Sequence, residues 1–227
     1  MTITAERRLR EKQVRRRSIL DAARDVFLDR GVSATTMDEI AQRAQLAKGT
    51  LYQYFNSKEE LCLALLVEAS QALIDALKAA LDPEAHPFDQ MIQLAREYHG
   101  FYLNRPDYFR LLFVLEHQPY RGHAADELQA RWTAMGREGL EILASVIGRG
   151  IDQGVIRALD PWTTAVSLWA ATTGVIVLPA QEIRWGFLGR LGHKELVLST
   201  VQNFWAGIKA EDEQRDRDPV EENRPIT

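Results

Sequence analysis

The sequence is poor in cysteine and histidine and has no long apolar run. Its 227 residues include one cysteine, Cys62, so no disulfide can form within the chain and a reducing, cytoplasmic setting is expected. The five histidines lack the His-x-x-x-His spacing that favours a metal site. The most apolar stretch, residues 165–180, is too short and too polar to span a bilayer, and no apolar signal-peptide segment follows the N-terminal charges. We therefore expect no metal and no membrane partner.

Motifs of enzyme catalysis are also missing. The chain has no G-x-S-x-G nucleophile elbow and no P-loop. The segment "GRGIDQG" at residues 148–154 misses the G-x-G-x-x-G spacing by one residue and falls within an expected helix. Cys62 lies in a leucine-rich helical pattern, which is typical of a buried small hydrophobe and not of a redox sensor. We expect no enzyme activity and no cofactor.

Charge is unevenly spread along the chain. Residues 1–58 carry 12 Lys and Arg against 7 Asp and Glu, whereas the remainder carries 16 against 25. The net charge of −4 therefore hides a basic head on an acidic body. Such a head indicates a polyanionic partner or, equally on charge alone, a solvated charged face.

Apolar residues follow helical spacing through most of the chain, and no segment alternates like a strand. Residues 1–13 are polar and are expected to form a frayed arm. Capping boxes at Thr36–Glu39 and Ser57–Glu60, and Asp160 before Pro161, mark helix starts. The fold class is therefore all-α, with helices at about residues 16–30, 37–44, 48–54, 58–81, 88–103, 107–117, 124–153, 161–180 and 193–209.

The stretch "TTMDEIAQRAQLAKGTLYQYF", residues 35–55, predicts two short helices separated by a break of only a few residues. This is the helix-turn-helix layout, in which the first helix crosses the phosphates and the second lies in the major groove. Leu51 and Phe55 are expected in the core, while the basic arm could follow the DNA backbone or enter a minor groove. Positions suited to phosphate or base contact are Lys48, Gly49, Thr50, Tyr52, Gln53, Tyr54 and Lys58.

The segment "ILDAARDVFLDRGVSATTMDEIAQRAQLAKGTLYQYFNSKEEL", residues 19–61, closely resembles the DNA-binding domain of the TetR family of bacterial transcriptional regulators. "TTMDEIA", "KGTLYQYF" and "SKEEL" occur in the family's order and spacing. The resemblance implies a homodimer that binds a double-stranded DNA operator with two half-sites, and a small-molecule effector pocket in the body. It implies phosphate contacts from Thr36, Tyr52 and Lys58, and a groove-facing set of Lys48, Gly49, Thr50 and Gln53.

Three regions follow from this reading. Residues 1–60 would form an N-terminal three-helix helix-turn-helix domain with a basic arm, and residues 61–210 a larger helical effector-binding and dimerisation domain. Residues 211–227 are charged and are expected to be a disordered tail.

Two positions depart from the family's pattern. Gln45 stands where the family usually has glycine, and Ala47 where it usually has serine or threonine. A left-handed Gln45 would cost about 1–2 kcal/mol relative to glycine, and Ala47 forfeits a helix cap worth about 1 kcal/mol. We expect a turn that is either differently shaped or less stable than usual.

The body offers candidates for a ligand pocket and for a dimer surface, each of which could instead be ordinary intrachain core. The segment "YHGFYLNRPDYFRLLFVLEH", residues 98–117, is dense in aromatics. Residues that could line a mostly apolar cavity are Tyr98, His99, Tyr102, Phe109, Phe113, His117, Trp132 and Trp169. The last two helices combine small residues with aromatics, and the expected interface residues are Trp169, Gly174, Phe204 and Trp205.

The sequence thus predicts a homodimeric transcriptional regulator, most simply a repressor that a small, largely apolar ligand releases from its operator. An activator of the same family is an alternative, because the sign depends on operator position. A helical carrier of apolar ligands without operator binding, or an unrecognised enzyme, is the alternative from another class.

Overall fold

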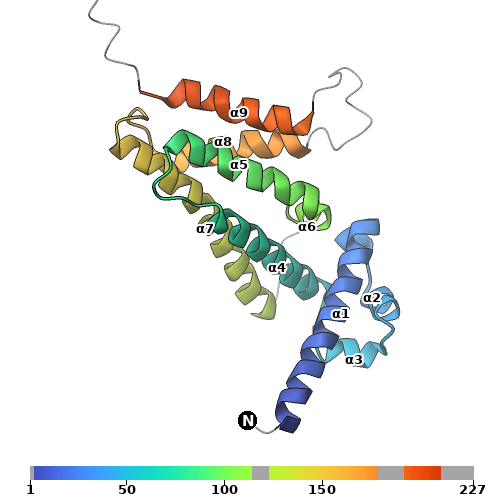
Figure 1. Cartoon of the computed structure of the whole chain (residues 1–227). Coiled ribbons are helices and arrows are strands. Elements are labelled where there is room, and N and C mark those ends of the chain that lie inside the picture. The colour runs from blue at the N-terminus through green and yellow to red at the C-terminus, as the bar shows by residue number, and fades with distance from the viewer. Residues whose placement is uncertain (1–2, 114–122, 178–191, 211–227) are drawn as a thin grey trace, which may run out of the picture.

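The computed structural model describes residues 3–113, 123–177 and 192–210, and these residues form helices with no strand, so the all-α prediction is confirmed (Figure 1). The expected helix ends near residues 117 and 180, together with His117 and the tail at residues 211–227, lie outside the described residues. The helices are α1 Ile3–Ala34, α2 Met37–Arg43, α3 Lys48–Tyr52, α4 Lys58–Ala79, α5 Pro87–Asn104, α6 Pro106–Phe113, α7 His123–Asp152, α8 Pro161–Val177 and α9 His193–Ile208.

The first helix is longer than the sequence analysis expected. Residues 3–13 are helical, so the prediction of a frayed arm over this part was wrong. The segment is made of good helix formers, and Arg7 Nε lies 2.8 Å from Glu11 Oε1 one turn later. The expected stop at Gly31 appears as a non-helical residue with φ 80° and ψ 161°.

Helices α2 and α3 are positioned by their caps. Thr36 Oγ1 accepts a hydrogen bond from the Glu39 backbone N–H (3.3 Å), and the Glu39 carboxylate accepts one from the Thr36 N–H (2.8 Å), which confirms the capping box. At the other end, the Leu46 N–H donates to the Ala41 carbonyl and the Gln45 N–H to the Gln42 carbonyl. This is a Schellman motif with Gln45 at φ 57°. The turn therefore has the shape that a glycine at position 45 would give. Because the chain has glutamine there, the backbone of Gln45 is strained in the left-handed conformation.

The head is held by a small apolar core beneath these caps. Phe27 of α1, Ile40 of α2, Leu51 of α3 and Phe55 are all nearly or fully buried. Leu51 and Phe55 therefore belong to the core, as expected. Ala47 gives α3 no side-chain cap, so this five-residue helix depends on the core contact of Leu51 for its position.

The body is a helical bundle in which α4 packs along α7 (Figure 1). Helix α8 packs against α7, and α9 packs against both α5 and α8. The helix α4 leads from the head into the middle of this bundle, and Cys62 lies buried on it. Asp160 accepts a hydrogen bond from the Thr163 N–H (2.7 Å), so the expected cap before Pro161 is confirmed. Hydrogen bonds from the Thr163 side chain and from its backbone N–H hold the pKa of the Asp160 carboxyl below its usual value.

Candidate DNA interface and ligand cavity

The short helix α3 lies beside the lower part of α1, at the end of the molecule away from α8 and α9 (Figure 1). Most of the expected contact positions on and around it are open to solvent: Thr36, Lys48, Gly49, Tyr52 and Gln53 are exposed. Thr50 and Tyr54 are half-buried, and Tyr54 packs against the head core. A Cβ added at Gly49 would meet no atom within 4 Å, so the chain leaves open space there.

The two lysines of the candidate interface already have partners in the free protein. Lys48 Nζ lies 2.6 Å from Asp38 Oδ1 of α2, and this contact raises the pKa of the Lys48 ammonium. Lys58 Nζ donates to the Ser33 and Thr35 carbonyls, each at 2.9 Å, where α1 ends. An ammonium has three N–H donors. Lys58 thus ties α4 to the end of α1 and keeps one donor for a phosphate.

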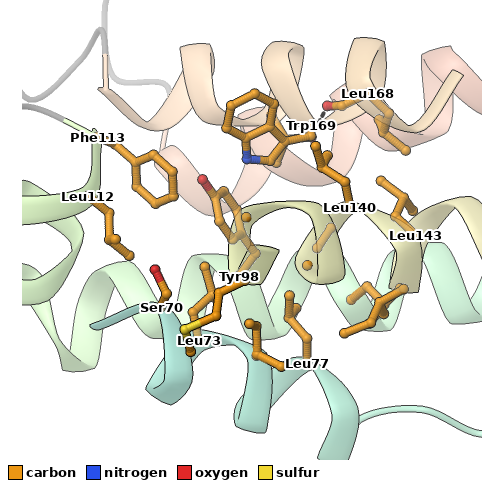
Figure 2. Close-up of a pocket in the computed structure, with 18 of the residues that line it drawn as sticks. Ser70, Leu73, Leu77, Tyr98, Leu112, Phe113, Leu140, Leu143, Leu168 and Trp169 are labelled. Carbon is orange, nitrogen blue, oxygen red and sulfur yellow. Dashed lines mark hydrogen bonds between the residues drawn. The ribbon is translucent and has the colours of Figure 1, made fainter. Parts of the chain in front are cut away.

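The body encloses a cavity of about 460 Å³ that is almost entirely apolar (Figure 2). Its walls come from α4, α5, α6, α7 and α8, with Val201 from α9. No lining residue carries a charge, and the polar groups are hydroxyls and the Trp132 and Trp169 indoles. The Tyr98 hydroxyl lies 2.8 Å from Thr173 Oγ1, and burial raises its pKa, so it stays protonated. This size and lining suit an uncharged or tail-inserting ligand.

Four of the eight expected ligand residues line this cavity: Tyr98, Phe113, Trp132 and Trp169. Phe109 lies behind them, with its ring 5.8 Å from that of Tyr98 and 4.8 Å from that of Phe113. Tyr102 and His99 are not among the lining residues. His99 is buried instead, with Nε2 unpartnered, and burial together with His193 and Lys194 lowers its pKa.

Apart from Trp132 of α7, none of the walls that α4 and α7 supply was predicted from the sequence. Figure 2 shows Ser70, Leu73 and Leu77 of α4 and Leu140 and Leu143 of α7 around the space. A usable signal was the pair Gly136 and Gly139 inside α7. Glycine in a helix interior costs about 1 kcal/mol relative to alanine, and both of these glycines line the cavity with no atom within 4 Å of an added Cβ.

The four expected interface residues lie on α8 and α9, and the two tryptophans among them also make contacts within the chain. The Trp169 side chain lines the cavity, and its ring lies 6.2 Å from that of Phe113. Trp205 packs within the chain, with its ring 5.3 Å from that of Phe88 on α5. Gly174 and Phe204 are half-buried.

A junction of polar side chains joins the head to the body. The Arg17 guanidinium and the Tyr108 hydroxyl both donate to the Glu68 carboxylate, which brings α1, α4 and α6 together. The hydrogen bond from Arg17 to the Tyr108 hydroxyl and the charge of Glu68 raise the pKa of the Arg17 guanidinium, while burial and Glu68 raise the pKa of Tyr108. Arg110 of α6 adds a hydrogen bond to the Leu28 carbonyl of α1 (3.1 Å). Because Leu112 and Phe113 line the cavity, α6 touches the head with one part and the cavity with another.

Two other kinds of site find no support within residues 3–113, 123–177 and 192–210. No group of three His, Cys, Asp or Glu side chains there could hold a metal ion. No helix in these ranges is both long enough and apolar enough to cross a membrane.

Comparison with known proteins agrees with this arrangement. Residues 19–65 match the family model described as bacterial regulatory proteins, tetR family. The chain is 37% identical over 99 residues to the HTH-type transcriptional activator FasR of Mycolicibacterium smegmatis, a match that covers 44% of this chain and 45% of FasR. It is 32% identical over 155 residues to the uncharacterized HTH-type transcriptional regulator YhgD of Bacillus subtilis, covering 66% of this chain and 76% of YhgD. The chain thus spans less than half the length of FasR but most of YhgD.

A solved structure extends the likeness over the body. FadR of Bacillus subtilis, in complex with stearoyl-CoA, superposes with a TM-score of 0.68 at 20% identity, covering 84% of this chain and 98% of that chain. At this identity the likeness shows the fold alone. These relatives are named as transcriptional regulators and not as enzymes.

Fold, head and relatives together define a DNA-binding transcriptional regulator with a helix-turn-helix head. The chain belongs to the TetR family of bacterial regulatory proteins.

Proposed function

We propose that this regulator is a homodimeric repressor, released from its operator by a small, largely apolar ligand that enters the body cavity. One observation carries the proposal: the uncharged cavity is bordered by α4 and α6, the two helices that also hold α1 of the head. An occupant that moves either helix therefore acts on the part of the molecule that carries α3.

The DNA contacts follow from the exposed side of the head. Lys48, Gly49, Thr50 and Gln53 would meet base edges, while Thr36, Tyr52, Tyr54 and Lys58 would meet phosphates. Two heads related by a two-fold axis would read half-sites about one DNA turn, or a multiple of it, apart. Residues Gly174 and Phe204 of α8 and α9 stay the expected dimer surface, with Trp205 and Trp169 as contributors from their partly buried positions.

The cavity sets the class of ligand. A buried charge without a partner is costly, and no lining residue could pair with one. A carboxylate or phosphate of the ligand would therefore remain outside while an apolar part fills the space. Acyl thioesters are the first class to test, because the FadR neighbour was solved with stearoyl-CoA.

Release requires that the ligand bind one conformation of the dimer more tightly than the other. We assign the difference to α6, since Leu112 and Phe113 touch the ligand space and Tyr108 touches Arg17 and Glu68. Filling the cavity would shift α6 and α4, and the two heads would no longer match the spacing of the half-sites.

The test is a binding assay on operator DNA with a panel of acyl-CoA thioesters, their free acids and uncharged aromatic compounds. At least one member should release the protein from DNA and change the fluorescence of Trp132 and Trp169. If members bind in the cavity by fluorescence but leave operator affinity unchanged, the proposed coupling is refuted. An activator would show the same binding behaviour, and a reporter gene downstream of the operator separates the two signs.

A carrier of apolar ligands is the alternative from another class. It would bind the panel equally well but give no operator footprint at any salt concentration. A regulator must instead bind duplex DNA with an affinity that falls steeply as salt rises.

A further inference from the structure

The N-terminal part of α1 carries a row of cations that the family match does not account for. The match begins at residue 19, whereas α1 begins at Ile3. Arg8, Lys12, Arg15 and Arg16 are spaced i, i+4, i+7 and i+8 and are exposed. This spacing places them on one face of the helix. We call this row the cationic stripe.

The stripe continues the face by which α1 packs into the head. Ile19 and Ala23 follow at the same helical spacing and are 0% exposed. Arg16 lies where the exposed cations of this face give way to its buried residues. Its guanidinium lies over the Phe55 ring, 5.1 Å from the centroid. Phe55 follows α3 by three residues. The stripe therefore starts at the C-terminal end of α3, where Tyr52 and Gln53 are exposed, and runs away from the body (Figure 1).

The charges of the stripe are not neutralised within the protein. Glu11, which lies between them in sequence, is paired with Arg7 at 2.8 Å. Arg8, Lys12, Arg15 and Arg16 form no ion pair with any described residue. Four unneutralised cations on one exposed helical face repel one another, so an anionic surface laid against them would lower their energy.

We propose that the stripe is a second DNA-binding element, which holds the phosphate backbone beside the segment read by α3. This proposal rests on the proposed operator binding. DNA presents about one negative charge per 1.7 Å of helix axis, and Arg8 to Arg16 spans about 12 Å at the rise of an α-helix. The stripe thus matches a run of phosphates that begins where the contacts of α3 end.

The helical form of this segment decides how it meets DNA. An α-helix with side chains is about 10–12 Å wide, whereas the minor groove is about 6 Å wide. The sequence left open that an extended arm enters the minor groove. Because the segment is helical, we expect it instead to lie across the DNA backbone as a helix. Such contacts add affinity and footprint length but no base preference.

The experiment compares three full-length proteins on a duplex obtained by selecting bound DNA from a random pool. The test variant is Arg8→Gln/Lys12→Gln/Arg15→Gln, which keeps good helix formers and spares Arg16 with its Phe55 contact. The control variant is Arg96→Gln/Arg131→Gln/Arg157→Gln, which removes the same charge from exposed positions of the body. Far-UV circular dichroism verifies that both variants keep their helices.

We expect the test variant to bind at least about tenfold more weakly, with a slope of log affinity against log salt that is smaller by about 2.7 per bound protomer. The control should keep the slope of the wild type. Hydroxyl-radical footprinting should show that the wild type protects backbone sugars outside the half-site, and this protection should vanish in the test variant while base preference stays.

An unchanged slope and footprint in the test variant, with normal binding by the wild type, would overturn this inference and leave the proposed function standing. Binding of the wild type to anionic phosphatidylglycerol vesicles or to a second copy, lost in the test variant while its DNA slope is unchanged, would assign the stripe to that partner and also overturn it. Failure of the wild type to bind any duplex would overturn the proposed function and this inference together.

Discussion

Arg24 Nε of α1 lies 3.2 Å from Asp107 Oδ2 of α6, so an ion pair joins the head directly to the first turn of a helix whose last residues line the cavity. The Arg24 side chain is only 20% exposed, so solvent screens this pair less than most surface pairs. The pair stands beside the contacts of Arg17 with Glu68 and Tyr108. The head therefore cannot rotate relative to α6 without breaking or remaking charged contacts.

Asp107→Asn should weaken the coupling between cavity and operator. The substitution removes the charge of α6 that pairs with Arg24 and leaves Arg24 its partners Asp21 and Asp25 within α1. Partly exposed ion pairs are worth up to about 1 kcal/mol. The ratio of operator affinities measured without and with a releasing acyl-CoA should fall by up to about fivefold. Arg7→Gln, which cuts an exposed pair within the first part of α1, serves as the control and should leave the ratio unchanged. Equal ratios for wild type and Asp107→Asn would show that α6 does not carry the coupling.

Gln45→Gly should stabilise the head. Gln45 is the only described residue other than glycine with a positive φ, at 57°, and the left-handed conformation costs about 1–2 kcal/mol outside glycine. The free energy of unfolding, measured by urea titration, should rise by a similar amount. Gln42→Gly, at an exposed position in the last turn of α2, is the matched control and should lower the free energy of unfolding by up to about 1 kcal/mol. A loss of stability in Gln45→Gly would mean that the Gln45 side chain makes a contact worth more than the backbone strain.

Gly139→Leu should close the cavity without unfolding the protein. An added Cβ at Gly139 meets nothing within 4 Å, so the leucine would occupy the ligand space instead of clashing with the backbone. Leucine is also a better helix former than glycine by about 1 kcal/mol. Ligand release should be lost while operator binding persists, as measured by fluorescence anisotropy of labelled duplex. Arg131→Leu on the exposed side of α7 should respond to ligand like the wild type, and a normal response in Gly139→Leu would place the ligand elsewhere.

Tyr52→Phe should weaken binding to all duplexes alike. Tyr52 is 43% exposed at the end of α3, and its hydroxyl is proposed to donate to a phosphate oxygen. Loss of one such bond costs about 1 kcal/mol, or about fivefold in affinity. Binding to a set of single-base operator variants should fall by the same factor at each position, and Tyr102→Phe in the body should have no effect. A loss confined to one base position would instead assign Tyr52 to base recognition.

Local sequence signals predicted most helix ends because each end is set by residues close in the chain. The capping box of Thr36 with Glu39 and the cap of Asp160 before Pro161 both appear as expected. The polarity of residues 3–13 predicted a frayed arm, but their helix propensity is high and they form the start of α1. The sequence left open whether the turn at Gln45 is differently shaped or less stable than usual. The left-handed φ of Gln45 and the hydrogen bonds around it required the structure.

The cavity was harder to predict because its walls come from six helices far apart in sequence. The aromatic density of residues 98–117 predicted cavity residues there, yet Phe109 supports the wall from behind and Tyr102 does not reach it. A single face of α5 or α6 cannot tell which of its aromatics borders empty space, since that depends on what the opposite helix supplies. Gly136 and Gly139 supply the space here, and they carry no hydrophobic signal at all.

The central claim is that two copies of α3 read duplex DNA, one in each half of a symmetric site. The most direct test is selection of bound duplexes from a random pool with the full-length wild type. We expect an enriched palindrome whose half-site centres lie about one helical turn, or a multiple of it, apart. Enrichment of a single unpaired site would contradict the dimer, and recovery of no preferred sequence even at low salt would contradict the claim itself.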